Sequence, residues 1–491
     1  MKTLGLTLAL VSLAFCVGCG TSNNNGGPPP TGNFSNASLS GQYAYQLAGE
    51  DLFNGVEFRE IGSFTADGAG HITGGSDDFV DGSLGVASTT ILNTSTYSIS
   101  NDGTATVFLN FSDTSAITLA MTLQSTSKAY LVEADTFATG AGVAEKQTAA
   151  AFSAPPSGTF VFRMHTTNGA FTSAGSTGNV GVLTIAGGVV TSGSEDVSDG
   201  GAAGSLTLTA GLFNTPDGNG RATGSLTDSS PATSSFIYYV VDANNIRFLS
   251  EDIGILGLGR AEKQTGAPFS NASLSGNYAF GGNGDTPTSI GNLRAVGQFD
   301  AMGDGTISSG ALDAAVDGTT ASNVAITGTY SNVDSTTGRT AVTLTGGVLT
   351  NEVVYLVSPS RAFFLVTDAG AVAEGSADLQ SSSSFTNASM NGQFAFLMDG
   401  FNSSFFIDRV ATLNWDGAGN LSLNELVNAS GTINVPGPLS GTYSVGSNGR
   451  TTGTISTVSN NMVFYLVSGS KAYILQNDAS TEIDGITELQ Q

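Results

Sequence analysis

The chain has 491 residues, of which only 11% are charged and 66 are glycine. Asp and Glu outnumber Lys and Arg by 40 to 15, so the formal net charge is −25 at pH 7. Such a negative field repels phosphate backbones and anionic lipid surfaces, which argues against nucleic-acid binding. The glycine-rich, weakly charged composition without periodic runs of helix formers favours short strands joined by tight turns.

Residues 1–19 resemble a bacterial lipoprotein signal. Lys2 supplies a positive start, residues 4–17 are apolar, and the segment ends in a lipobox-like Cys-Val-Gly-Cys. The resemblance implies a lipidated Cys19, and acyl chains contribute about 0.8 kcal/mol of membrane affinity per buried CH₂. Because Gly20 rather than Asp follows, the resemblance also implies sorting to the outer membrane or cell surface of a Gram-negative bacterium.

The alternative is an ordinary secretory signal, with Cys19 lost or left as a lone thiol. Residues 20–33 are rich in Gly, Pro and Asn and are predicted to form a flexible tether. After removal of the signal no other cysteine remains, so no disulfide is expected in the folded part.

One stretch occurs four times in related form and divides the rest of the chain into four tandem units. It reads Phe-Ser-Asn-Ala-Ser-Leu-Ser-Gly-Gln-Tyr-Ala-Tyr from residue 34 and returns in related form at intervals of 116 to 118 residues. A unit of that length can bury its own core, so we expect self-sufficient units strung along the chain. The predicted units are repeat 1 over 34–150, repeat 2 over 151–268, repeat 3 over 269–384 and repeat 4 over 385–491.

Each unit shows the pattern of about eight short strands. A short 3₁₀ turn precedes the first strand, in which Tyr43, Tyr45 and Leu47 share one face and are predicted to lie in the core. Later strands such as 236–241 and 353–357 are apolar without interruption, which indicates that a neighbouring unit or a partner covers their second face. The predicted fold is all-β, with four antiparallel meanders that form up-and-down eight-stranded barrels. β-Sandwiches are the alternative.

The opening of the first strand carries a further resemblance. A Gly-x-aromatic motif stands at Gly41-x-Tyr43, Gly158-x-Phe160, Gly276-x-Tyr278 and Gly392-x-Phe394. With the meander that follows, it resembles the lipocalin and avidin group of eight-stranded barrels, whose usual Trp is Tyr or Phe here. The tandem arrangement also resembles uncharacterised tandem-repeat lipoproteins of environmental bacteria, which implies a location and no activity.

Few residues in the sequence suggest chemistry. The two histidines, His71 and His165, do not correspond between copies, so we expect no Ser-His-Asp triad or zinc site and interpret both as surface or turn residues. Clustered carboxylates recur before a glycine turn and are candidate Ca²⁺ ligands, with ordinary turn chemistry as the alternative. These carboxylates are Asp77, Asp78, Asp81, Glu195, Asp196, Asp199, Asp313 and Asp317. No other cofactor and no catalytic residue is predicted.

The sequence favours a non-enzymatic, membrane-anchored lipoprotein in which four units bind a surface partner such as a glycan or a protein, or serve the envelope structurally. Repetition of weak sites on one tether would increase avidity. A lipocalin-like carrier of a small apolar ligand is the second hypothesis. A hydrolase that uses a pair of carboxylates from different loops is the third.

Overall fold

A computed structural model describes residues 32–82, 84–168, 173–289, 291–402, 405–456 and 460–491. The predicted lipidation site Cys19 and the signal around it lie outside the described residues. Regular structure consists of antiparallel strands and five short 3₁₀ turns. Within the described part of the chain, no helix has the length and apolar character needed to cross a membrane. The all-β prediction is confirmed.

The first two units contain seventeen strands. Unit 1 comprises η1 Asn36–Ser38, β1 Ser40–Asp51, β2 Val56–Asp67, β3 Ile72–Asp81, β4 Ala87–Ile91, β5 Thr96–Ile99, β6 Thr104–Asn110, β7 Ala116–Ser125, β8 Lys128–Glu133 and β9 Ala138–Lys146. Unit 2 comprises η2 Ala149–Phe152, β10 Gly158–Thr167, η3 Ser173–Gly175, β11 Ser176–Ala186, β12 Val189–Asp199, β13 Ala202–Phe213, β14 Arg221–Asp228, β15 Thr233–Asp242, β16 Asn245–Ser250 and β17 Leu256–Lys263.

The last two units repeat this order of strands. Unit 3 comprises η4 Asn271–Ser273, β18 Ser275–Asp285, β19 Leu293–Met302, β20 Thr306–Val316, β21 Thr319–Tyr330, β22 Arg339–Thr345, β23 Asn351–Ser358, β24 Arg361–Val366 and β25 Val372–Leu379. Unit 4 comprises η5 Asn387–Ser389, β26 Asn391–Asn402, β27 Phe405–Asp416, β28 Asn420–Ala429, β29 Thr432–Asn434, β30 Leu439–Val445, β31 Arg450–Ile455, β32 Asn460–Ser468, β33 Lys471–Gln476 and β34 Thr481–Leu489.

The predicted barrels are present in a meander topology. Units 2 and 3 are closed eight-stranded barrels, and an additional β27–β28 pairing closes unit 4. Unit 1 is a nine-stranded sheet in the order β4-β3-β2-β1-β9-β8-β7-β6-β5. Its two ends are joined by the isolated bridges His71–Thr96 and Ile91–Phe111. Closure of this kind leaves few unpaired strand edges, and the sandwich alternative is excluded.

Two of the repeated motifs bind each other in each of units 1, 3 and 4. The Asn-Ala-Ser segment forms a 3₁₀ turn with a capping box, and the Gly41 that follows has φ +101°, a conformation that favours glycine. In unit 1 the Tyr97 hydroxyl donates a 2.8 Å hydrogen bond to the Leu39 carbonyl, and the equivalent bonds recur in units 3 and 4. The Thr-Tyr-Ser motif therefore anchors the start of the first strand.

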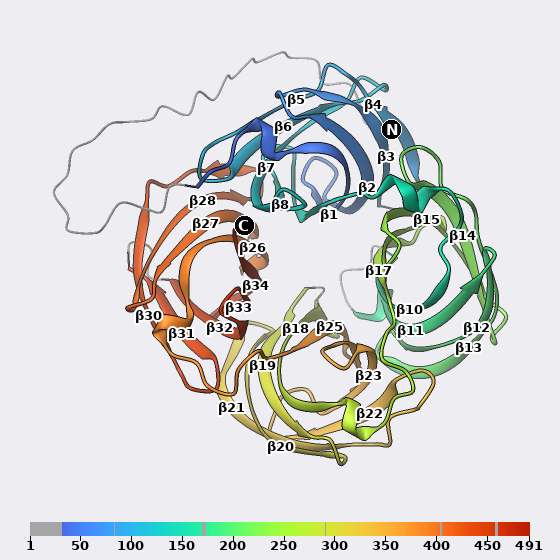
Figure 1. The fold of residues 1–491 in the computed structure, drawn as a ribbon, viewed down its shortest axis with the longest axis vertical. Coiled ribbons are helices and arrows are strands. Elements are labelled where there is room, and N and C mark those ends of the chain that lie inside the picture. Colours follow the sequence, from blue (N-terminus) through green and yellow to red (C-terminus); the bar gives the residue numbers. More distant parts are fainter. Residues whose placement is uncertain (1–31, 83, 169–172, 290, 403–404, 457–459) are drawn as a thin grey trace.

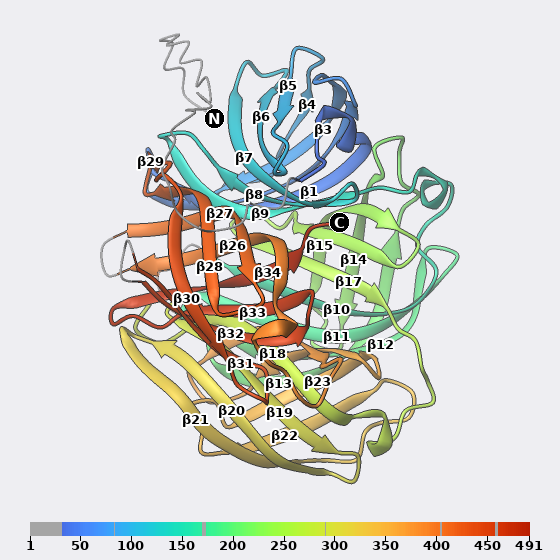
Figure 2. The same ribbon diagram turned by 60° about the vertical axis from the view of Figure 1, so that its left-hand side comes forward.

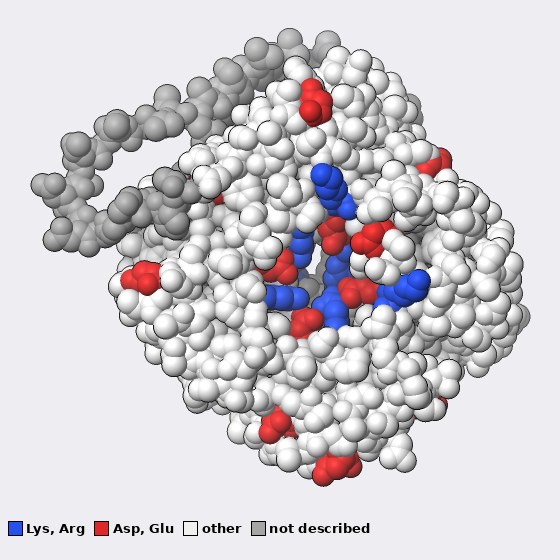
Figure 3. Space-filling view, in the orientation of Figure 1, with Lys and Arg blue, Asp and Glu red and all other residues white. Residues whose placement is uncertain are grey.

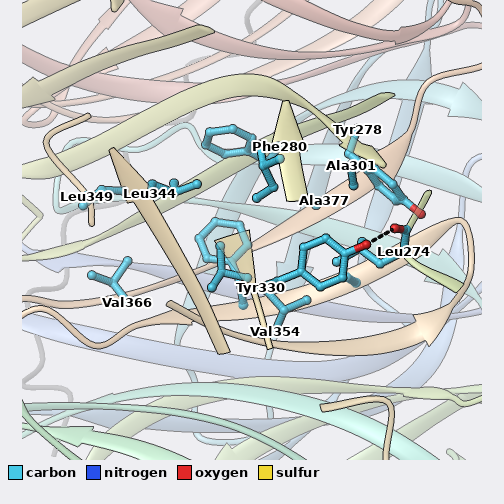
Figure 4. Close-up of a cluster of buried hydrophobic side chains, with 14 of the residues drawn as sticks. Leu274, Tyr278, Phe280, Ala301, Tyr330, Leu344, Leu349, Val354, Val366 and Ala377 are labelled. Atoms are coloured by element: carbon cyan, nitrogen blue, oxygen red, sulfur yellow. Dashed lines mark hydrogen bonds between the residues drawn. The ribbon is translucent and has the colours of Figure 1, made fainter. Parts of the chain in front are cut away.

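Each unit buries its own apolar core. In unit 3, Tyr278 and Phe280 on β18 lie in this core, as predicted for the first-strand aromatics (Figure 4). The Phe280 ring packs edge-to-face against Phe364. The interior of this barrel leaves a cavity of only about 20 Å³. That volume holds one water molecule at most.

The units form a closed ring and not a string of separate beads (Figures 1 and 2). The uninterrupted apolar strands supply the contacts: Ile237, Tyr239 and Val241 on β15 pack against Ala44 and Ile61 of unit 1. Corresponding clusters join unit 2 to unit 3, unit 3 to unit 4, and unit 4 to unit 1. The expectation of units strung separately along the chain is therefore wrong, because these strands carry a second apolar face that only a neighbouring unit covers.

One glutamine holds each junction of the ring. Gln147, after the last strand of unit 1, donates hydrogen bonds through Nε2 to the carbonyls of Asn219 (3.0 Å) and Val240 (2.7 Å) of unit 2. Gln264 and Gln380 make the same pair of bonds at the next two junctions. The fourth junction is closed by Gln490, which donates to the carbonyls of Asp102 (3.1 Å) and Leu123 (2.7 Å) of unit 1.

Candidate functional site

A cavity of about 450 Å³ lies at the centre of the ring, where the first and last strands of the units face one another. All four units contribute charged groups to its wall, among them Arg59, Arg163, Arg294 and Asp408. Figure 3 shows Lys and Arg side chains alternating with Asp and Glu around the opening, while the surface around it carries few charges. The volume lies within the range of about 300–1,000 Å³ that is typical of small-molecule sites.

Ion pairs around the cavity join each unit to the last strand of the unit before it. The four pairs are Arg247 with Glu145, Arg361 with Glu262 (2.6 and 2.8 Å), Lys471 with Asp378 (2.8 Å) and Lys128 with Glu488 (2.7 Å). Burial opposes ionisation of Glu262, but the Arg361 guanidinium outweighs it and lowers the pKa of Glu262 to about 2. The Lys128 pair spans units 1 and 4, so this network also runs around the complete ring.

His165 on β10 of unit 2 bridges two carboxylates of unit 3. Its Nδ1 lies 3.1 Å from Glu374 Oε2, and its Nε2 lies 3.0 Å from Asp285 Oδ2. Burial lowers the pKa of His165, but the two carboxylates outweigh burial and hold the pKa well above its usual value. The interpretation of His165 as a surface or turn residue is therefore wrong, because the side chain is an ion-paired part of the cavity wall. His71 is exposed and follows the β2–β3 turn, as expected.

Unit 4 brings two carboxyl groups to the cavity on neighbouring strands. Asp399 on β26 and Asp408 on β27 are directly opposite each other in the strand register. Burial raises the pKa of Asp408 to about 8, and Thr139 of unit 1 donates a hydrogen bond to it. Asp399 lies 3.3 Å from Arg294, which pairs more closely with Asp484 at 2.5 Å. Titratable groups with shifted pKa values in a cavity are typical of functional sites.

The four units carry different residues at equivalent positions around the cavity and in its wall. The strand registers give the residues that occupy equivalent positions. Three such sets are Gln46, Arg163, Gly281 and Leu397; Ala48, His165, Asn283 and Asp399; and Val143, Arg260, Ser376 and Ile486. By contrast, the junction glutamine is the same residue in all four units. The repeat therefore preserves the ring while giving the cavity four chemically different sides.

Three of the carboxylates predicted as calcium ligands form contacts that hold neighbouring units together. Asp78 accepts 2.7 Å hydrogen bonds from Nε and Nη2 of Arg221 and from the Tyr239 hydroxyl, both in the next unit. The same triad recurs at the next two junctions, as Asp196 with Arg339 and Tyr355, and as Asp313 with Arg450 and Tyr465. At the junction of units 4 and 1 the equivalent positions hold Leu426, Thr104 and Thr122.

The other predicted calcium ligands lie apart from one another. Asp77 accepts a hydrogen bond from Tyr45 (2.7 Å), Glu195 from Asn179 (3.1 Å), Asp199 from Thr177 (3.0 Å) and Asp317 from Thr286 (2.7 Å), while Asp81 ends β3. In the part of the chain that the structure describes, no three His, Cys, Asp or Glu side chains gather in a way that could hold a metal ion. Calcium binding by these residues stays a prediction.

Sequence reasoning missed the basic residues of unit 2 at the cavity. Arg163 and Arg260 are 97 positions apart in the sequence, and only the β10–β17 register places them opposite each other. Arg247 on β16 is in turn opposite Arg260, at the position that Tyr130 holds in unit 1. A residue-by-residue comparison of the copies in the correct register would have singled out all three arginines.

Comparisons with known proteins leave the chain without an assigned family. No protein-family model matches it, and no curated protein matches it. Among solved structures, a single-substitution mutant of the vaccine antigen Transferrin Binding Protein B from Haemophilus parasuis Hp5 is 9% identical with a TM-score of 0.19, over 74% of this chain and 82% of that chain. Intact Ap-TbpB, with its N and C lobes, is 10% identical with a TM-score of 0.20, over 74% and 83% of the two chains. Likenesses this remote support no argument about function.

Proposed function

We propose that the protein is an exported, non-enzymatic binding protein, anchored by lipid at Cys19 to the outer membrane or cell surface, and that its ligand occupies the central cavity of the ring. The observation that carries the proposal is the divergence of the four units at the cavity. A residue that only supports the ring meets the same surroundings in each unit, so we expect it to be the same residue in all four. The junction glutamine meets this expectation. The residues that face the centre at one equivalent position, Ala48, His165, Asn283 and Asp399, are respectively apolar, basic, neutral polar and acidic.

The closed ring alters how multivalent binding would work. Independent beads on a tether would gain avidity by moving separately, whereas these units are fixed by apolar clusters and ion pairs at every junction. The filled interior of the third barrel also disfavours an apolar ligand inside a single unit. A single composite site at the centre fits both observations. It is also compatible with the anchor, because residues 20–33 would let the ring stand away from the membrane.

The anchor and the binding site have separate tests. Radioactive palmitate should label the protein made in a Gram-negative host, and a Cys19→Ala variant should stay unlabelled. For the site, native mass spectrometry of the full-length lipoprotein in detergent should detect a small molecule bound from an extract of the native host.

Two variants locate that ligand. Ala48→Trp places an indole on an exposed position of the cavity wall, and it should abolish binding. Ala202→Trp makes the same change on the exposed outer strand β13 and should leave binding intact. Ligand binding that is equal in both variants would rule out the central cavity as the binding site.

A carboxylate hydrolase is a second candidate, favoured by Asp399 and Asp408. The two residues are directly opposite each other on neighbouring strands, so both carboxyl groups can reach the same substrate, as the paired carboxylates of a glycosidase do. With its pKa of about 8, Asp408 would serve as the acid. This candidate predicts that the protein cleaves chromogenic glycosides and that Asp408→Asn abolishes cleavage. Undiminished cleavage in that variant would exclude the assignment.

A further inference from the structure

We infer that the central cavity binds an oxyanion, the carboxylate, sulfate or phosphate group of a small molecule, between Arg163 and Arg260 of unit 2. The inference rests on the proposed function and narrows its ligand to a chemical class. It depends on the arrangement of the arginines, on the partners they lack, and on the residues that replace them in the other three units.

Three arginines stand side by side on adjacent strands of unit 2. In the strand registers, Arg163 on β10 is opposite Arg260 on β17, and Arg260 is opposite Arg247 on β16. Directly opposed residues in antiparallel strands have Cβ atoms about 4.5–5.5 Å apart, and like charges at that separation destabilise a sheet. Arg163 and Arg260 line the cavity. The sequence therefore concentrates positive charge on one side of the central space.

The carboxylates near this row are engaged by other cations. Glu374 lies 3.9 Å from Arg163 Nη1 but only 3.1 Å from the His165 imidazole. Glu262 lies 3.9 Å from Arg260 Nε, while Arg361 forms two bonds of 2.6 and 2.8 Å with the same carboxylate. Contacts of 3.9 Å are too long for hydrogen bonds. The guanidiniums of Arg163 and Arg260 thus lack the close anionic partner that other arginines of the ring possess.

One atom of this pair is buried without a hydrogen-bond partner. The Arg163 Nε has none among the described residues, although guanidinium donors taken out of water are normally satisfied. The side chains of Arg163 and Arg260 remain 26% and 25% exposed, so a solute in the cavity can reach them. Two guanidiniums facing one space offer the forked donors that bind carboxylate, sulfate and phosphate oxygens.

The arginine row is absent from the other three units. The equivalent rows read Gln46, Val143 and Tyr130 in unit 1; Gly281, Ser376 and Phe363 in unit 3; and Leu397, Ile486 and Tyr473 in unit 4. Every one of these residues is uncharged. The barrel consequently forms without cations at these positions. Arg247 has a structural role in its pair with Glu145 of unit 1, but Arg163 and Arg260 have no such junction partner among the described residues.

The electrostatics of the site favour an anion between the two arginines. Burial, followed by the charge of Arg247, lowers the pKa of Arg260 to about 9. Burial also lowers the pKa of Arg163, with Arg361 acting in the same direction. An anion bound between the two guanidiniums would offset the repulsion from Arg247 and Arg361 that contributes to these lowered pKa values. The net charge of −25 repels anions at long range, so such a ligand must be held by close contacts.

Isothermal titration of the full-length lipoprotein in detergent tests the inference. The probes are sodium phosphate, sodium sulfate and a small dicarboxylate, each titrated at pH 7 and at constant ionic strength maintained with chloride. We expect saturable binding of at least one probe, with competition between the probes. Arg163→Gln and Arg260→Gln should each weaken that binding at least tenfold. Lys263→Gln removes a charge from the same strand away from the cavity and should leave the affinity unchanged.

A crystal soak keeps the inference testable if a variant fails to fold. Tungstate is a heavy oxyanion whose anomalous signal should appear between Arg163 and Arg260 in the unaltered protein. Binding elsewhere, binding matched by chloride, or equal affinity in the arginine variants would overturn the inference. A third outcome separates the two proposals: Ala48→Trp abolishes ligand binding, while Arg163→Gln and Arg260→Gln leave the affinity unchanged. That result would overturn the oxyanion assignment and would still support the central cavity as the binding site.

Discussion

Arg450 holds the carboxylate of Asp313 in the preceding unit with two hydrogen bonds of 2.7 Å, from Nε and Nη2. The Asp313 side chain is completely buried, so its charge depends on this clamp and on the Tyr465 hydroxyl at 2.6 Å. Asp313→Asn should cost about 2 kcal/mol of unfolding free energy, because it removes a buried anion that accepts three hydrogen bonds and leaves the partly buried Arg450 guanidinium unpaired. Chemical denaturation measures the loss. Asp304→Asn, at an exposed turn of the same unit, should change stability by less than about 0.5 kcal/mol.

Loss of the last junction glutamine should open the ring. Gln490→Ala removes two hydrogen bonds to unit 1 and should cost about 2 kcal/mol at that junction. Gln264→Ala removes the equivalent bonds between units 2 and 3, which the chain itself also connects. Small-angle scattering should therefore show a larger radius of gyration for Gln490→Ala alone. Equal radii for the two variants would show that the junction of units 4 and 1 is held by other contacts.

Raising the pH should weaken the contact that His165 makes between units 2 and 3. The pKa of His165 is raised in the folded state by Glu374 and Asp285, so its stabilising contribution is complete below about pH 6.5. That contribution is lost as the pH rises through the higher folded-state pKa. His165→Gln should lower stability at pH 6 by about 1–3 kcal/mol and flatten the decline at higher pH. Thermal unfolding at several pH values checks both effects.

Asp408 should make the protein less stable as the pH rises. Burial raises its pKa to about 8 from the usual 3.8, so the folded state holds a proton that the unfolded state releases between these values. The contribution is present below about pH 4 and is lost as the pH approaches 8, at about 1.4 kcal/mol for each unit of pKa difference. Asp408→Asn keeps an acceptor for Thr139 and removes the titration. Its melting temperature should fall less than that of the unaltered protein between pH 5 and pH 8.

The barrels were predictable because their signals are local. Alternation at Tyr43, Tyr45 and Leu47 identifies an inward face, and the uninterrupted run from 236 to 241 correctly indicates a second covered face. The sequence does not show which surface covers that face. It therefore does not predict the ring, which depends on contact between the fourth unit and the first. That contact joins residues more than 250 positions apart, such as Ala120 and Val410, which no periodicity reveals.

The site was harder to predict because it combines residues from four units. His165 seemed isolated as one of two histidines, since its partners Asp285 and Glu374 lie more than 100 residues further along the chain. The acidic residues drew attention as calcium ligands because they recur, yet Asp78, Asp196 and Asp313 recur as parts of the junctions. In this molecule, the residues that repeat between units hold the ring together, and residues that differ between units line the candidate site.

The contacts of Gln490 with unit 1 also constrain how the repeat number can change. The four units complete the circle, and the fourth junction reproduces the glutamine bonds of the other three. Loss of one copy would leave an open arc with two uncovered apolar flanks. Exposed apolar flanks of this size would make such a chain prone to associate with itself, so closure of the ring also protects the protein from aggregation.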